Sequence, residues 1–185
     1  MYQPPATRYW PKIWLMTDQR NDHCLEESIS LLPSAGGGII FRHYHLSEIA
    51  RRNRFMQIKS LAKKHGHLLM LADSPGLARS WGADGIHGRQ WRRSQTSGLF
   101  QSAPVHSRRE ITAAKRNGAD IYFLSPAYAT QSHPGQKPLH GMQLRNLINL
   151  CGGPVILLGG MTAGRFKQCQ HLGAQGWAAI DGLMS

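Results

Sequence analysis

The sequence is short of acidic side chains, of cysteine and of long apolar runs. Its 185 residues hold 22 Lys and Arg against 10 Asp and Glu, a formal net charge of +12, and only 3 cysteines. Cys24, Cys151 and Cys169 lie far apart without the spacing of metal ligands, so we expect reduced and mostly buried thiols. No apolar run approaches the ~20 residues of a membrane span, and the N-terminus lacks the apolar stretch of a signal peptide. These absences favour a cytoplasmic protein with no membrane partner.

The excess of positive charge names no partner by itself. No zinc-finger spacing or aromatic RNA-binding signature accompanies it, so we do not expect nucleic acid as a partner. We interpret most of the charge as a solvated basic surface that also suits an anionic small substrate. The basic residues are scattered, with one group in the loop of Arg89, Arg92 and Arg93 and another along a predicted helix, formed by Arg51, Arg52, Arg54, Lys59, Lys63 and Lys64.

Short apolar runs alternate with helical stretches along the whole chain. Gly-Ala pairs that begin at Gly82, Gly118 and Gly173 mark where a helix ends before the next strand, because glycine suits the left-handed position past a helix end. Repeated units of this kind predict a parallel sheet. The runs indicate eight strands, separated by about seven helices, at 13–18, 38–44, 67–73, 85–87, 104–107, 120–127, 154–158 and 177–180.

This pattern predicts a compact (β/α)8 TIM barrel. We expect a single domain over residues 1–185, with residues 1–11 as a flexible N-terminal segment. The chain is short for a fold that usually exceeds ~200 residues, so the last helix is expected to be truncated or missing. The stretch 89–102 is too rich in turn residues for a regular fourth helix. A doubly wound open sheet is the alternative fold.

Two glycines after the seventh predicted strand indicate a phosphate pocket. Gly159 and Gly160 follow the run 155–158, and a short helix leads to the strand that ends before Asp181 and Gly182. Glycines let backbone N–H groups approach an anion closely, and the following helix adds the positive end of its dipole. In α/β barrels such a pocket lies after strands seven and eight. A tight strand-to-helix turn without a ligand is the alternative.

The succession of motifs over about residues 13–183 resembles the thiamine phosphate synthase and thiazole tautomerase superfamily. No single piece is specific, and their order along the chain carries the resemblance. The pieces are Leu15-Met16-Thr17-Asp18, Phe41-Arg42, Ala72-Asp73 through Leu77-Ala78, Gly82-Ala83-Asp84-Gly85-Ile86-His87, Val105-His106-Ser107, Gly118-Ala119-Asp120, Ser125-Pro126 with Thr130, and Gly159-Gly160-Met161.

The resemblance implies a TIM-barrel transferase of thiamine biosynthesis that joins an aminopyrimidine diphosphate to a thiazole phosphate. Mg²⁺ and cations would neutralise the departing diphosphate at the C-terminal mouth of the barrel. The histidines near the strand ends are candidates for proton transfer, because histidine titrates near neutral pH. The predicted catalytic residues are Arg42, His87, His106 and His133, the predicted substrate- and phosphate-binding residues are Gln90, Thr130, Ser132, Gly159, Gly160, Asp181 and Gly182, and Asp73 is the predicted metal ligand.

Several positions depart from the family pattern. The asparagine expected beside the metal aspartate is Ala72, and continuation from His87 without a gap places Arg92 at a second metal aspartate. Half of the magnesium set is therefore absent, and an arginine there would put a fixed cation in place of Mg²⁺. The serine expected after strand eight is Asp181, whose carboxylate repels a phosphate unless a cation bridges them. We interpret Asp181 as the partner of a basic side chain near the mouth.

The sequence leaves other roles and functions open. Asp73 has an alternative role as the cap of the helix near Ser74, and His87 and His106 as buried histidines with satisfied hydrogen bonds. The synthase reaction is the first interpretation. A thiazole tautomerase-like enzyme is the second, although Pro126 stands where the tautomerase histidine is expected. A non-catalytic member that binds a phosphorylated ligand is the third. Small phosphorylated heterocycles are the expected partners, and a homo-oligomer stays open.

Overall fold

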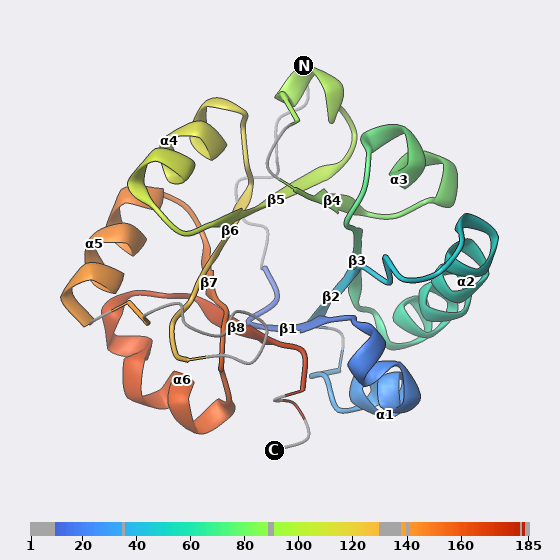
Figure 1. Ribbon diagram of the computed structural model, residues 1–185, viewed down its shortest axis with the longest axis horizontal. Helices are drawn as coiled ribbons and strands as arrows, with labels where there is room; N and C mark the ends of the chain where they lie inside the picture. The colour runs from blue at the N-terminus through green and yellow to red at the C-terminus, as the bar shows by residue number, and fades with distance from the viewer. Residues whose placement is uncertain are drawn as a thin grey trace.

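The computed structural model describes residues 10–34, 36–88, 91–129, 138–139, 141–181 and 183. Within these residues eight parallel strands close into a barrel in the order β1-β2-β3-β4-β5-β6-β7-β8, and the helices surround it (Figure 1). Closure is made by β8 and β1, whose register aligns Ile13 with Trp177. The (β/α)8 prediction is confirmed, and the open-sheet alternative is wrong.

The strands are short and almost wholly buried. They are β1 (Ile13–Met16), β2 (Gly37–Phe41), β3 (Leu68–Leu71), β4 (Gly85–His87), β5 (Phe100–Val105), β6 (Ile121–Leu124), β7 (Val155–Leu157) and β8 (Gly176–Ala179). Strands covered on both faces have continuous apolar runs, which is why the sequence located most of them.

Strand β5 is the exception, because it begins at Phe100 rather than at the predicted Pro104. Its first half contains Gln101 and Ser102, and in the sequence these polar residues look like part of a loop. Both are buried, and each donates one hydrogen bond: Gln101 Nε2 to the Trp91 carbonyl at 2.8 Å and Ser102 Oγ to the Ile86 carbonyl at 3.1 Å. Buried polar groups with hydrogen-bond partners are tolerated in a core.

Four of the helices begin after a serine or threonine cap. Ser47, Ser74, Ser107 and Thr162 each accept a backbone N–H of the first helical turn. The helices are α1 (Leu25–Ser30), α2 (Glu48–His65), α3 (Pro75–Trp81), α4 (Arg108–Arg116), α5 (Gly141–Cys151) and α6 (Ala163–Cys169), with 3-10 turns η1 (Gln19–Cys24), η2 (Arg93–Gln95) and η3 (Gln170–Leu172).

Two predictions about missing helices concern the fourth and eighth units. Between β4 and β5 the described residues form only the turn η2, as expected from the turn-rich sequence. After β8, residues 180, 181 and 183 form no helix. In the described part of the chain no helix is both long and apolar enough to cross a bilayer.

The barrel interior is filled by side chains. Trp14 and Phe123 are fully buried at its centre, with their rings edge to face at 5.2 Å. Trp10, expected in a flexible segment, is instead buried, and its ring meets Phe100 edge-on at the amino-terminal end. A packed interior leaves the two ends of the barrel for chemistry, and in barrels of this kind the carboxyl end is used.

Candidate active site

The described site residues all follow or end strands at the carboxyl end of the barrel. Because the strands are parallel, their carboxyl ends lie at one mouth of the barrel (Figure 1). Arg42 follows β2, Asp73 follows β3, His87 ends β4, His106 follows β5, Gly159 and Gly160 follow β7, and Asp181 follows β8. His133, Gln90, Thr130, Ser132 and Gly182 lie outside the described residues, so their predicted roles stay predictions.

Arg42 is held against the end of β1. Its Nε donates to the Thr17 carbonyl at 2.8 Å and its Nη2 to Asp18 Oδ2 at 2.9 Å. Its backbone N–H donates to Thr17 Oγ1 at 2.9 Å. Burial lowers the pKa of Arg42, and the carboxylate of Asp18 opposes that shift. The guanidinium is therefore a preorganised cation at the mouth, where an anion would meet it without a large rearrangement.

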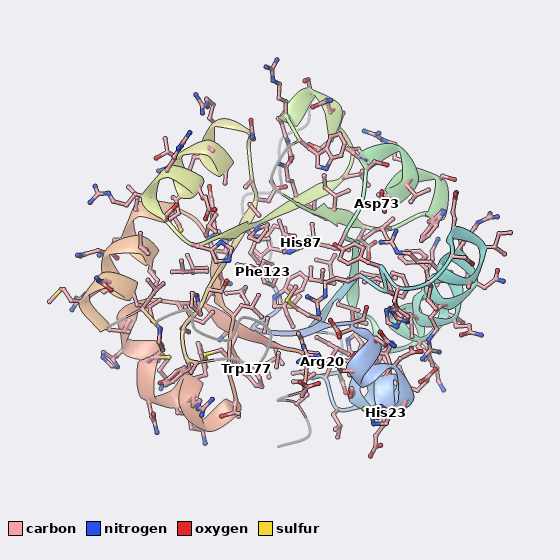
Figure 2. All side chains as sticks on the ribbon, in the orientation of Figure 1. Arg20, His23, Asp73, His87, Phe123 and Trp177 are labelled. Carbon is pink, nitrogen blue, oxygen red and sulfur yellow. The ribbon has the colours of Figure 1, made fainter. Side chains whose placement is uncertain are left out.

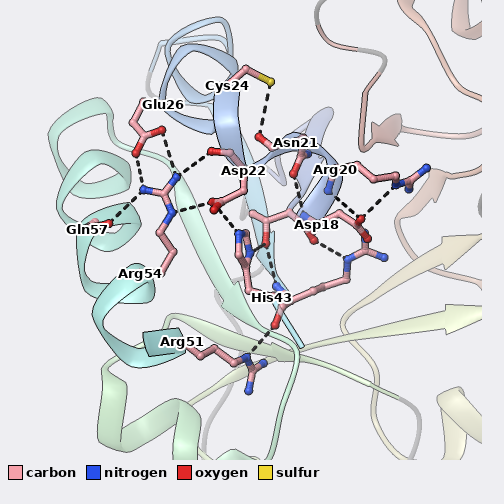
Figure 3. A network of polar contacts seen from close by, with 12 residues as sticks. Asp18, Arg20, Asn21, Asp22, Cys24, Glu26, His43, Arg51, Arg54 and Gln57 are labelled. Carbon is pink, nitrogen blue, oxygen red and sulfur yellow. Dashed lines mark hydrogen bonds and ion pairs between the residues drawn. The ribbon is translucent and has the colours of Figure 1, made fainter. Parts of the chain in front are cut away.

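A buried hydrogen-bond network supports the backbone of Arg42 (Figure 3). His43 has a left-handed backbone, with φ of 40°, and is 1% exposed. Its Nδ1 lies 2.7 Å from Thr17 Oγ1, and its Nε2 lies 2.9 Å from Asp22 Oδ1. Although burial raises it, hydrogen bonds from His43 and Arg54 hold the pKa of Asp22 below its ordinary value. The ionised Asp22 therefore accepts a hydrogen bond from Nε2–H of His43, and Nδ1 accepts one from the threonine hydroxyl.

The prediction that the basic residues of α2 form a solvated surface is wrong for two of its arginines. Arg54 Nε donates to Asp22 Oδ1 at 2.8 Å, and its Nη1 to Glu26 Oε1 at 2.5 Å. Arg51 is 7% exposed and lies over the rings of Trp81 and Tyr44. The basic spacing in the sequence did not reveal these roles, because the acidic partners come from other segments.

Asp73, labelled in Figure 2, is paired with an arginine of helix α2. Its Oδ2 accepts from Arg51 Nη1 at 2.5 Å, and its Oδ1 accepts the backbone N–H of Ser74 at 2.7 Å. Ser74, not Asp73, caps α3, since its hydroxyl accepts the Leu77 N–H at 3.2 Å. The alternative role of Asp73 as a helix cap is therefore wrong.

The described residues do not fit the Mg²⁺ site that the resemblance implies. Within them no group of three or more His, Cys, Asp or Glu side chains could hold a metal ion. Mg²⁺ needs an octahedron of oxygens, and the Asp73 carboxylate is already paired with Arg51. Ala72 offers only its carbonyl, which accepts from Arg51 Nη2 at 3.2 Å. Arg92, at the position of the second aspartate, is exposed.

The two described histidines of the predicted catalytic set occupy different surroundings. His87 Nδ1 lies 2.9 Å from Ser102 Oγ, and its ring meets Phe123 edge-on near the barrel centre (Figure 2). Since the Ser102 hydroxyl donates to the Ile86 carbonyl, Nδ1 of His87 carries the proton. His106 Nδ1 lies 3.1 Å from Oε2 of Glu110, which is in the first turn of α4.

The Gly159–Gly160 turn lies against the segment after β6. Both glycines have positive φ, of 95° and 59°. A Cβ at Gly160 would strike the carbonyl oxygen of Ala129, and one at Gly159 would lie 3.1 Å from Pro126 Cα. Tyr128 N–H donates to the Gly159 carbonyl at 3.0 Å. Close backbone packing therefore requires glycine here, besides any anion that the turn binds.

An arginine that the sequence did not single out completes this turn. Arg165, in the first turn of α6, donates from Nη1 to the Gly160 carbonyl. Its guanidinium lies 5.0 Å from the centre of the Tyr128 ring. A cation therefore stands beside the predicted phosphate turn, and the only signal in the sequence was its position just after Thr162.

Asp181 pairs with a basic side chain, as predicted. Arg20 Nη1 lies 3.6 Å from Asp181 Oδ2, and Arg20 Nε lies 3.1 Å from Asp18 Oδ1. Asp18 also contacts Arg42, so four alternating charges run across the ends of β2, β1 and β8. This chain of ion pairs offsets the charge of Asp181, which the sequence left beside a predicted phosphate site.

Comparisons with known proteins agree with the fold and the motifs. A family model described as thiamine monophosphate synthase matches residues 13–183. A protein of Aquifex aeolicus (strain VF5), provisionally named thiamine-phosphate synthase 2, is 26% identical over 179 residues, which are 92% of this chain and 96% of the relative. The thiamine-phosphate synthase of Synechococcus sp. (strain WH7803) is 25% identical over 174 residues, 90% of this chain and 47% of that relative. The chain thus spans about half the length of the Synechococcus protein.

A solved structure extends the likeness to three dimensions. The thiamine phosphate pyrophosphorylase from Pyrococcus furiosus superposes with a TM-score of 0.75 at 19% identity, over 91% of this chain and 85% of that chain. At this identity the likeness shows the shared barrel fold. Because the family model covers the chain from the first strand to beyond the last, the protein belongs to the thiamine monophosphate synthase family.

Proposed function

We propose that the protein joins an aminopyrimidine diphosphate to a thiazole phosphate and releases diphosphate. Family membership supports this, and so do the names of the Aquifex and Synechococcus relatives. The observation that carries the proposal is one mouth that holds two features suited to bind anions. Arg42 comes from the end of β2, and the Gly159–Gly160 turn comes from the end of β7.

The reaction needs positive charge more than acid–base groups. The bond between the pyrimidine methylene carbon and the diphosphate oxygen breaks, and its electron pair leaves with the diphosphate. The thiazole nitrogen then donates its lone pair to the carbocation. Arg42, preorganised by Thr17 and Asp18, would stabilise the charge that develops on the leaving oxygen.

The remaining residues are proposed to bind and shape the substrates. The backbone N–H groups of Gly159 and Gly160, with Arg165 beside them, would hold the thiazole phosphate. His87 and His106 would line the mouth. We keep as proposed substrate contacts Gln90, Thr130, Ser132, His133, Asp181 and Gly182. No step is assigned to a metal ion, because the described donors do not form a site for one.

A turnover assay tests the proposal. The protein is incubated with both substrates, and thiamine phosphate and diphosphate are measured by mass spectrometry. We expect equal amounts of the two products, and Arg42→Gln should lower kcat/KM about 100-fold or more. The matched control is Arg52→Gln, which replaces an exposed arginine of α2 and should keep the wild-type rate. Wild-type protein that yields no product, with or without Mg²⁺, overturns the proposal.

A non-catalytic ligand-binding role is the second candidate. It is favoured by the ion pairs of Arg42 with Asp18 and of Arg20 with Asp181, which already neutralise cations at the mouth. Calorimetry with the thiazole phosphate distinguishes the two, since saturable binding without turnover identifies a binder. The tautomerase alternative loses support, because Pro126 has no group that transfers a proton.

A further inference from the structure

We propose that the buried guanidinium of Arg51 takes the place of a divalent cation at Asp73, so that the diphosphate end of the site works without a protein-bound metal. The identity of the anion rests on the proposed function. The absence of a metal site at Asp73 does not, and it is tested separately below.

Three oxygens from neighbouring strand ends converge on Arg51. Its Nε donates to the Arg42 carbonyl at 2.8 Å, Nη1 to Asp73 Oδ2 at 2.5 Å and Nη2 to the Ala72 carbonyl at 3.2 Å. One carboxylate and two backbone carbonyls are ligands of the kind that hard divalent cations take. Here all three are satisfied by one positive charge that belongs to the protein itself.

The guanidinium is locked into this position. Arg51 is 7% exposed. Its guanidinium carbon Cζ lies 5.3 Å from the centre of the Tyr44 ring, 5.7 Å from that of Trp81 and 6.0 Å from that of Phe41. An arginine side chain does not lose its proton in proteins. A metal ion that took Asp73 Oδ2 would have to displace this cation and leave a buried charge without its carboxylate, which is strongly unfavourable.

The charge of Asp73 is balanced without a metal. In the pattern implied by the resemblance, two aspartates and one Mg²⁺ sum to zero. In this chain Asp73 and Arg51 form an ion pair whose charges cancel, and Arg92 at the second aspartate position brings the sum to +1. The positive charge of a metal ion is thus not needed to neutralise the carboxylate of Asp73.

The position of Arg51 links it to the proposed chemistry. Its Nε holds the carbonyl of Arg42, the residue proposed to meet the leaving diphosphate. Arg51 therefore acts as a positioning residue for the end of β2, and it supplies a permanent positive charge next to Asp73. Neither the positioning of β2 nor this positive charge should be lost when a chelator removes metal ions.

Manganese binding tests the inference on the full chain, with Mn²⁺ alone as the probe and electron paramagnetic resonance as the readout. The quantity measured is the Mn²⁺ bound by the wild type minus that bound by Asp73→Asn. We expect no difference between them at millimolar metal. Arg51→Gln, which removes the cation and leaves an amide oxygen, should gain a site at least about tenfold tighter, since an unpaired carboxylate and two carbonyls then face it. The exposed neighbour variant Arg52→Gln should gain none.

Two results overturn the inference. The first is a wild-type Mn²⁺ site that Asp73→Asn removes. The second is a folded Arg51→Gln variant that gains no site. Where circular dichroism shows Arg51→Gln to be unfolded, the comparison of the wild type with Asp73→Asn decides alone. A failure of the synthase assay leaves these binding results unaffected, so the two proposals fail separately. If the synthase is active, product should form in EDTA at a rate within about tenfold of that in Mg²⁺.

Discussion

Replacement of Arg51 by methionine should destabilise the barrel through loss of charge and hydrogen bonding. Methionine is an unbranched apolar side chain that removes the contacts to the Arg42 carbonyl, to Asp73 and to the Ala72 carbonyl. Removal of one partner of a buried ion pair costs about 3–5 kcal/mol. Because the Asp73 side chain is 32% exposed and recovers part of its hydration, we expect the lower end, about 3 kcal/mol in the free energy of unfolding.

A double-mutant cycle separates the pair from the rest of the effect. Asp73→Asn keeps an oxygen that accepts from Arg51, so it should cost about 1–2 kcal/mol. The double variant should be more stable than the sum of the two single losses predicts, with a coupling energy of about 1–2 kcal/mol, because neither charge is then unpaired.

The measurement is urea unfolding at equilibrium, followed by circular dichroism and tryptophan fluorescence. The midpoint should shift while the denaturant dependence stays constant. Arg52→Met, an exposed neighbour on α2, is the control and should change stability by less than about 0.5 kcal/mol. An Arg51→Met variant as stable as this control, or a cycle with additive losses, would refute the reasoning.

Three further predictions concern other parts of the molecule. Gly160→Ala forces a side chain into positive φ and against backbone, and should cost about 1–3 kcal/mol, whereas Gly76→Ala, in open space on a helix, should not destabilise in the same urea assay. Burial holds the pKa of His43 below its ordinary value of 6.5. The unfolded state therefore binds more protons than the folded state as the pH falls below 6.5. The contribution of neutral His43 to the free energy of unfolding is present above pH 6.5 and is lost as the pH falls. His43→Asn, which tolerates positive φ, should therefore reduce the change in unfolding midpoint between about pH 7.5 and about pH 5.5, and an unchanged difference would contradict this. Burial raises the pKa of the Cys151 thiol to about 12, so in native protein it should not react with dithionitrobenzoate at about pH 8, while the half-buried Cys24 should; rapid reaction that persists in Cys24→Ser would be the contrary result.

Local patterns predicted most of the fold. Apolar runs such as 120–127 and 154–158 contain β6 and β7, and helix α3 begins at Pro75, next to the start near Ser74 that the sequence indicated. Such features depend on neighbours within a few residues, so they are visible in one sequence. Strand β5 was placed too late, because the burial of Gln101 depends on an acceptor at Trp91 that only the folded chain brings near.

The candidate site likewise has features that the sequence predicted and features that it did not. By itself the sequence determined that Arg42, Asp73 and the Gly159–Gly160 turn end strands of one parallel barrel, because strand order and direction follow from the alternation of strands and helices. Only the tertiary structure decided what these groups contact. The partner of Asp73 is a buried arginine of α2, and the partner of Asp181 is Arg20 from the opposite end of the chain. A basic residue looks the same in sequence whether water or a carboxylate surrounds it, and the choice is made by packing between segments that are distant along the chain.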